Sequence, residues 1–344
     1  MKTKHLFIKL ITLFGVTLLT LNGCAKTATE SPEDVLQKFK ETAKEIKAAD
    51  FTASLAMVGI DKGDEMDFNL VADVKVDRRE DMESKADVNL KIDGSLKAGD
   101  KSMSGNFNFK FRTLGEDYYF NLIEFDSTDP NVEKYKVLVE PYLKKWQHIS
   151  SDFIPENIRG LQEKDEETLA KEEELKELFV NTRFFDVVKE FGVENLNGKK
   201  VYHYGLKLNK DGLSQYVRKA ASINGREMTE AEVEETVAFA ESVTDIELWI
   251  GTKDYYVYKG EVSLSGEGLE EKGVKADVTV TYIANSYNTN LKIEAPADAE
   301  EFNPLSLLMD LQMSGMIGGE EPAIEEVGGL EMMESEAMES EVVE

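Results

Sequence analysis

Cysteine is nearly absent from this chain of 344 residues, in which Cys24 is the single one. One cysteine cannot form an intramolecular disulfide, so the folded part must be stable without covalent cross-links. Histidine is scarce too, and besides His5 the sequence holds only His148 and His203. Neither has a cysteine or another histidine at the spacing of metal ligands, so we interpret both as surface residues and predict no metal site.

Positive charge is also in short supply, with 40 Lys and Arg against 68 Asp and Glu and a net charge of −28. Such an acidic surface repels phosphate backbones and anionic head groups, which excludes nucleic acid as a partner and disfavours adhesion to acidic membranes. Catalytic motifs are missing as well, because the chain has no Gly-x-Ser-x-Gly elbow, P-loop or Gly-x-Gly-x-x-Gly. We therefore predict no catalytic residues and no cofactor, and expect a protein that is not an enzyme.

Apart from one segment near its start, the sequence lacks an apolar run that approaches the length of a membrane span. That segment, from Leu10 to Leu21, follows three lysines and leads into Leu21-Asn22-Gly23-Cys24. Its charge and length are typical of a signal peptide. Its ending resembles the lipobox of bacterial lipoproteins, in which Asn22 is a departure from the more usual Ala or Ser.

The lipobox resemblance implies how the chain is processed and where it resides. Residues 1–23 would be removed as a signal peptide, and the sulfur of Cys24 would carry a diacylglycerol, with palmitate among the acyl chains. Residues 24–30 are small and polar and would form a tether. We expect an exported protein of the bacterial cell envelope, held on a membrane by its acyl chains, with inner or outer membrane left open.

The spacing of apolar residues predicts the helices and strands. Ser31-Pro32 begins a helix at about 32–48, because a hydroxyl N-cap and a proline at the first helical position favour a start there. From Phe51 the apolar period becomes 2, which predicts a meander of long antiparallel strands with one apolar face. Further helices are predicted at 130–149, 163–180, 182–192, 211–222 and 229–242. Further strands are predicted at 199–208, 245–250, 256–264 and 274–282, and Leu291 and Ile293 close the sheet.

Glycine-containing turns separate the predicted strands. The turns are predicted at Lys62-Gly63-Asp64, Asp93-Gly94, Ala98-Gly99-Asp100, Leu114-Gly115-Glu116 and Asn197-Gly198.

This order of elements behind a lipobox resembles the LolA/LolB and LppX/LprG-type lipoproteins. The local features that carry the resemblance are Leu196-Asn197-Gly198, Tyr202-His203-Tyr204-Gly205-Leu206-Lys207-Leu208, Asp211-Gly212-Leu213 and Ile246-Glu247-Leu248-Trp249-Ile250. The resemblance implies an α+β fold in which a large curved antiparallel sheet, a half-barrel, has helices covering its concave face. We expect this domain at 31–303, as a monomer, with acyl chains of a ligand between sheet and helices.

A ligand cavity is therefore one interpretation of the apolar sheet face, and a filled core is the other. Both stay open at this point. In the first, the chain binds or carries a lipid or another hydrophobic ligand. In the second, it is a non-catalytic interaction protein of the envelope. The residues predicted to line or rim the cavity are Phe68, Leu70, Phe107, Phe109, Tyr118, Phe120, Tyr202 and Tyr204.

The end of the chain has a different composition. Leu305 to Met316 is rich in Met and could form a short helix, whereas the residues from Gly318 onward include ten Glu and no Lys or Arg. Residues without enough apolar surface to bury stay unfolded. We therefore predict that 304–344 is an acidic, mostly disordered tail.

Overall fold

The computed structural model describes residues 30–61, 63–79, 84–133, 135–151, 166–265 and 274–303. The predicted signal peptide, Cys24, residues 24–29 of the tether and the tail at 304–344 all lie outside these ranges. The chain divides into a unit at 1–302 and a second at 303–344. The helices and strands described below belong to the first unit.

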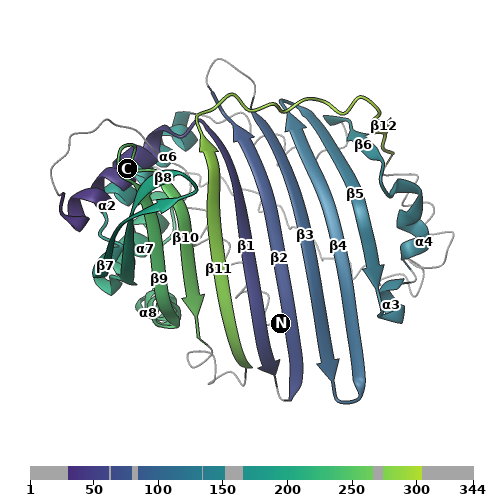
Figure 1. Ribbon diagram of the computed structural model, residues 1–344, viewed down its shortest axis with the longest axis horizontal. Coiled ribbons are helices and arrows are strands. Elements are labelled where there is room, and N and C mark those ends of the chain that lie inside the picture. Colours follow the sequence, from purple (N-terminus) through teal and green to yellow (C-terminus); the bar gives the residue numbers. More distant parts are fainter. Residues whose placement is uncertain are drawn as a thin grey trace, which may run out of the picture. The chain divides into compact units, whose positions relative to one another are not determined.

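Within the described ranges, twelve strands form a single open sheet (Figure 1). Its strand order is β12-β6-β5-β4-β3-β2-β1-β11-β10-β9-β8-β7, and every neighbouring pair is antiparallel except β12 with β6. This confirms the predicted α+β class with a large antiparallel half-barrel sheet. The strands are β1 (Ala48–Asp61), β2 (Asp64–Asp77), β3 (Lys85–Ala98), β4 (Lys101–Leu114), β5 (Asp117–Ser127), β6 (Trp146–Ile149), β7 (Phe185–Leu196), β8 (Lys199–Leu208), β9 (Val243–Gly251), β10 (Val257–Leu264), β11 (Val274–Tyr287) and β12 (Glu300–Glu301).

The sheet consists of two meanders, β1 to β6 and β7 to β11, joined where β1 pairs with β11. Tight turns set the register inside each meander. Asn197 and Gly198 both have positive φ in the two-residue loop between β7 and β8, as hairpin turns of that length require. The predicted turn at Asn197-Gly198 is thus confirmed, whereas Asp93-Gly94 is not a turn but lies inside β3. Leu291 and Ile293 do not close the sheet either. They lie outside the strands, and the two edges of the sheet are β12 and β7.

The described helices gather at the β7–β10 end of the sheet, while α3 and α4 stand beside β5 (Figure 1). Helix α2 begins as predicted, with the hydroxyl of Ser31 accepting a hydrogen bond from the amide of Asp34. Lys40 of α2 ties two helices together, since its ammonium donates to the carbonyls of Val180 and Thr182 at the end of α6. The helices are α2 (Pro32–Thr42), η2 (Ala43–Glu45), α3 (Pro130–Glu133), α4 (Lys136–Val139), η3 (Glu140–Tyr142), α6 (Glu166–Asn181), α7 (Lys210–Ile223) and α8 (Glu230–Glu241).

Two helix predictions are wrong. The predicted helix at 182–192 is strand β7, in which Gly192 has a φ of +97° at a register shift opposite β8 rather than at a helix end. A glycine with positive φ serves a β-bulge as well as a helix cap, so the sequence signal was ambiguous. The predicted helix at 130–149 is broken into α3, α4, η3 and β6, because Pro141 and a positive φ at Lys144 interrupt it.

No helix in the described part of the chain is both long enough and apolar enough to cross a membrane.

Candidate functional site

The strongest candidate site is the apolar face of β2 to β5, which we name the open face. Cross-strand register lines up apolar residues row by row, so that Leu70, Ile92, Phe107 and Phe125 follow one another from β2 to β5. Alternation then places the remaining members on the same side of the sheet. The open face comprises Phe68, Leu70, Ala72, Val88, Leu90, Ile92, Phe107, Phe109, Phe111, Tyr118, Phe120, Leu122 and Phe125.

Most side chains of the open face are only half-buried. Tyr118 and Leu122 on β5 are buried, whereas Phe68, Phe107 and Phe109 keep part of their surface accessible. The helices that pack on the sheet lie mainly at its other end, on β7 and β9. The prediction that helices cover the concave face therefore holds for the β7–β10 part of the sheet, and the described helices leave β2 to β4 largely bare.

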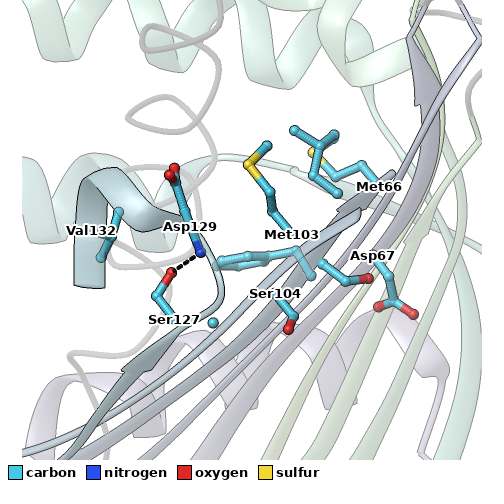
Figure 2. Close-up of a pocket in the computed structure, with 12 residues that line it drawn as sticks. Met66, Asp67, Met103, Ser104, Ser127, Asp129 and Val132 are labelled. Atoms are coloured by element: carbon cyan, nitrogen blue, oxygen red, sulfur yellow. Dashed lines mark hydrogen bonds between the residues drawn. The ribbon is translucent and has the colours of Figure 1, made fainter. Parts of the chain in front are cut away.

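A hollow of about 300 Å³ lies at one end of the open face (Figure 2). Gly94 of β3 and Gly105 of β4 are register partners, flanked by Phe68 of β2 and Ser127 of β5. Because neither glycine has a side chain, the sheet surface is low at this point. The residues around it are Met66, Asp67, Phe68, Gly94, Ser95, Leu96, Met103, Ser104, Gly105, Ser127, Asp129 and Val132.

The rim of the hollow carries two methionine side chains, and a hydrogen bond fixes one corner of it. Figure 2 shows Met66 and Met103 on the strands and Val132 on α3 at the other side. The backbone amide of Asp129 donates to the hydroxyl of Ser127 at 3.1 Å and so holds the chain that leads from β5 into α3. Methionine side chains adapt to irregular apolar partners, which suits a site for a flexible chain.

A row of aromatic rings leads away from the hollow, and we name it the aromatic track. Phe107, two residues beyond Gly105, has its ring 5.9 Å from that of Phe109. Phe109 is 6.0 Å from Phe120, and Phe120 is 5.0 Å from Phe302. The track therefore continues the apolar surface of the hollow across β4 and β5 to the β12 edge.

The structure brings together six of the eight predicted cavity residues. Those on β2, β4 and β5 share the open face, and among them Phe68 lines the hollow itself. Tyr202 and Tyr204 are not brought there, since β8 is separated from β2 by β9, β10, β11 and β1.

Tyr204 belongs instead to a packed core. It is buried together with Val35, Leu36 and Phe39 of α2. Its ring stacks 6.0 Å from that of Tyr202, and burial raises the pKa of the Tyr204 hydroxyl above its usual value. Helix α2 thus occupies the space above these tyrosines that a ligand would need.

The two histidines are not the free surface residues expected from the sequence. The ring of His203, which is 8% exposed, is stacked between Phe191 at 4.0 Å and Trp249 at 4.1 Å, and its Nε2 contacts Glu247 at 2.9 Å. It does lie on the face opposite Tyr202 and Tyr204, as alternation predicts.

His148 is partly exposed and bridges two carboxylates, Glu301 at 2.7 Å and Asp117 at 3.1 Å. Two carboxylates around one histidine form an ion-pair cluster at a sheet edge. Within the described ranges, no group of three or more His, Cys, Asp or Glu side chains is arranged to hold a metal ion.

Sequence reasoning missed the hollow because it depends on register. The alternation of Leu90 and Ile92 does place Gly94 on the apolar face, and that of Phe107 and Phe109 does the same for Gly105. Only the pairing of β3 with β4 brings the two glycines opposite each other. A glycine inside an alternating strand was the available signal, and it marks a place where something approaches the backbone closely.

Comparisons with known proteins give weak likenesses. No family model matches the chain, and no curated protein does. Among solved structures it is similar to the lipoprotein LppX of Mycobacterium tuberculosis, with 9% identity, a TM-score of 0.28, and coverage of 77% of this chain and 100% of that one. It is also similar to a DUF1329 family protein from Desulfovibrio piger, with 9% identity, a TM-score of 0.16, and coverage of 72% and 88%.

A third likeness is to an outer membrane lipoprotein-sorting protein domain from Vibrio parahaemolyticus, with 10% identity, a TM-score of 0.14, and coverage of 71% and 87%. The chain thus resembles LppX and a lipoprotein-sorting domain, as its sequence led us to expect. TM-scores this low say nothing about ligand or activity, so the proposal below depends on the sheet itself.

Proposed function

We propose that this chain is a lipid-anchored envelope protein that binds or carries a lipid or another hydrophobic ligand on the open face. The observation that carries the proposal is the half-buried apolar surface that runs from the hollow at Gly94 and Gly105 along the aromatic track. Monomeric soluble proteins rarely leave a continuous apolar patch of this kind without a binding role. The ligand lies on the open face of β2 to β5 and not in the core under the helices.

Affinity in such a site comes mainly from the apolar area removed from water. Each methylene that becomes buried contributes about 0.8 kcal/mol. The hollow, at about 300 Å³, lies at the lower end of the usual size range of small-molecule pockets. It suits the end of one flexible chain, and the track suits the length of that chain. Selectivity for chain length is then low.

The anchor is a separate part of the proposal and depends on the lipobox sequence at Cys24. Cys24→Ala should leave an uncleaved precursor or release the protein from the membrane. Membrane fractionation together with the mass of the N-terminal peptide checks this. Unchanged fractionation with an unchanged peptide mass would contradict it.

Protein interaction is the second candidate function, and edge strand β7 favours it. Val188, Phe191 and Val193 are exposed there, and β7 ends the strand order. Exposed apolar residues on an edge strand are a common docking surface for another chain. In this alternative a partner chain docks on β7, and the open face binds no lipid.

Lipid extraction of the purified full-length protein, followed by mass spectrometry, separates the two functions. The carrier proposal expects a co-purifying lipid in excess of a mock extract, and uptake of a fluorescent fatty-acyl probe by delipidated protein. Gly94→Phe should weaken that uptake at least about tenfold, because the ring takes the place of two or more methylenes of the probe. A β-carbon at Gly94 would lie 3.6 Å from Phe68 Cδ2, an ordinary contact, so the fold should survive.

Val58→Phe is the matched control, since Val58 is exposed at the same end of the sheet on the opposite face. It should leave probe binding unchanged. If wild-type protein yields no lipid and takes up no probe, the carrier proposal fails and the interaction-protein reading replaces it.

A further inference from the structure

A buried amide at the far end of the aromatic track has no function in the fold described so far. Gln147 of β6 is the register partner of Phe120, so its side chain lies on the same side of the sheet as the open face. It is 2% exposed, and no described residue accepts a hydrogen bond from its Nε2.

Such an unpaired donor is rare in folded proteins. Leaving a buried polar group without a partner costs free energy, so each case calls for an explanation. Apolar rings lie beside Gln147, and its register partner on β12, Glu300, accepts no hydrogen bond from its Nε2. Phe302 stacks edge-on against Phe120 at 5.0 Å and against Tyr142 at 5.4 Å. A buried hydrogen-bond donor beside aromatic rings is the arrangement expected where a largely apolar ligand has one oxygen that accepts a hydrogen bond.

We propose that Gln147 is the polar anchor of the bound lipid. Its side-chain amide donates a hydrogen bond to an acyl ester carbonyl, while the acyl chain follows the aromatic track and ends in the hollow between Gly94 and Gly105. This inference rests on the proposed function and adds to it the chemical class of the ligand and its direction in the site.

The distance between the two ends fits one acyl chain. Phe111 lies six residues beyond Gly105 on β4, and its register partner Phe120 pairs with Gln147. At about 3.4 Å per residue this is about 20 Å. A lipid tail spans about half of a hydrocarbon core that is about 30 Å thick. The path from Gln147 to the hollow is thus long enough for a whole tail and too short for two tails end to end.

The charges near Gln147 favour a neutral carbonyl over a free carboxylate. Glu300 is its register partner on β12, and Glu301 follows. Lys145 lies 3.5 Å from Glu300 and offsets part of that charge. With a net charge of −28 on the chain, a fatty-acid anion would approach against like charge, whereas an ester would not.

The test compares two fluorescent probes on delipidated full-length protein. One is a long-chain acyl methyl ester, and the other is the hydrocarbon of the same length and fluorophore without the carbonyl. Wild-type protein should bind the ester about five- to tenfold more tightly, as expected for one hydrogen bond to a buried donor. Gln147→Met, which keeps the length of the side chain and removes the donor, should bind the two probes equally.

Asn121→Leu is the matched control. Asn121 is 5% exposed, and its Oδ1 also lacks a partner among the described residues, but it pairs with Trp146 and so faces the other side of the sheet. It should keep the preference for the ester. The free fatty acid, added as a third probe at neutral pH, should bind more weakly than its methyl ester.

The outcomes separate the two proposals. If wild-type protein binds neither probe, the proposed function fails. If it binds both probes with equal affinity, lipid binding stands and the proposed role of Gln147 is overturned. The same holds if Gln147→Met keeps the preference for the ester. Ligand-free Gln147→Met should melt close to wild type, because the Nε2 donor that it removes has no partner among the described residues. A clearly lower melting temperature would show that the amide is paired in the free protein and would also overturn the inference. Should Gln147→Met fail to fold, Gln147→Asn withdraws the donor by one methylene and must lower the preference.

Discussion

Two regions of one sheet, built from the same alternating pattern, end in different states. In the covered half, β7 to β11 with α2, α6, α7 and α8, side chains such as Ile250 of β9 and Val35 of α2 are fully buried. In the open half, strands β2, β3 and β4, whose residues the structure describes throughout, hold no fully buried apolar side chain. The difference is what lies on top of the strands. Helices turn the apolar face of the covered half into a core, whereas the described helices leave β2 to β4 largely bare, and we propose that this part of the face binds the ligand.

The two halves also differ in how polar groups contribute. Buried tyrosines in the covered half find hydroxyl partners inside the core, as when Tyr282 and Tyr287 meet at 2.8 Å. In the open half, charged pairs lie at the ends and on the outer side of the sheet. Arg112, for example, makes a bidentate contact with Asp87 at 3.1 Å. We infer that stability is concentrated in the covered half and ligand response in the open half.

The largest expected effect is on stability in the covered half. Ile250 is 0% exposed, so Ile250→Ala should lower the free energy of unfolding by about 2–5 kcal/mol. Leu90→Ala removes a side chain of similar size from the open face, where it is only half-buried, and should cost about half as much or less. Denaturant unfolding of both variants with unchanged slopes measures the difference. Equal costs would mean that the open face is as tightly packed as the core, and the comparison between the halves would be wrong.

The next expected effect is on ligand binding, which should change the open half more than the covered half. A saturating acyl ligand, at about 100 times its Kd, should raise the free energy of unfolding by about 2.7 kcal/mol. Hydrogen exchange should slow along β2 to β5, where the ligand lies, and change little in β8 and β9. Gly94→Phe should remove most of this protection. Slower exchange confined to β7 to β9 would place the ligand under the helices and contradict the site.

The alternation of apolar residues was enough to predict a large antiparallel sheet with a polar outer face, but not strands β6, β7 and β12. Phe107, Phe109 and Phe120 fell on one side as expected, because side chains alternate strictly along a strand. Alternation does not say what covers a face. Tyr204 and Phe109 lie on the same side of the sheet and follow the same pattern, yet one lies under α2 and the other does not.

The features that carry the proposals needed long-range information. The hollow depends on the register of Gly94 with Gly105, and the anchor depends on β6 pairing with β5 so that Gln147 meets Phe120. A lone Gln in a short segment predicted as helix gives no signal at all. Strand β7 was mistaken for a helix because Gly192 fits a bulge and a helix cap equally well from sequence alone.

A smaller effect concerns the end of β2 in the open half. Asp77 is buried, and hydrogen bonds from Arg79 hold the pKa of its carboxyl below the usual value. A lowered pKa in the folded state adds stability above the unfolded pKa of about 3.9, and this stability is lost as the pH falls through the lower folded value. Asp77→Asn should therefore cost about 1–2 kcal/mol at pH 7 and progressively less below about pH 4. Melting curves at several pH values test this, and a cost that does not change with pH would contradict the ion-pair account.

The smallest expected effect has the opposite pH dependence and lies at the β12 edge. The hydrogen bond that His148 donates to Glu301, with a second that it donates to Asp117, raises the pKa of His148 above its usual value. A raised pKa in the folded state stabilises below the unfolded value of about 6.5, and that stability is lost as the pH rises through the higher folded value. Both carboxylates are largely exposed, so solvent and salt reduce the effect.

His148→Gln should therefore lower the melting temperature slightly at about pH 5.5, below the unfolded pKa, and the difference from wild type should shrink as the pH rises through the raised folded pKa of His148. The stacking of His148 on Tyr119 at 4.9 Å is available at any pH, so it does not mimic this trend. Added salt should shrink the difference at low pH only. Since the amide of Phe302 donates to the carbonyl of His148 at 2.8 Å, its exchange, corrected for intrinsic rates, should follow the same titration. A pH-independent difference would show that His148 acts through packing. The ion pairs of His148 with Glu301 and Asp117 would then contribute nothing to the stability of this edge.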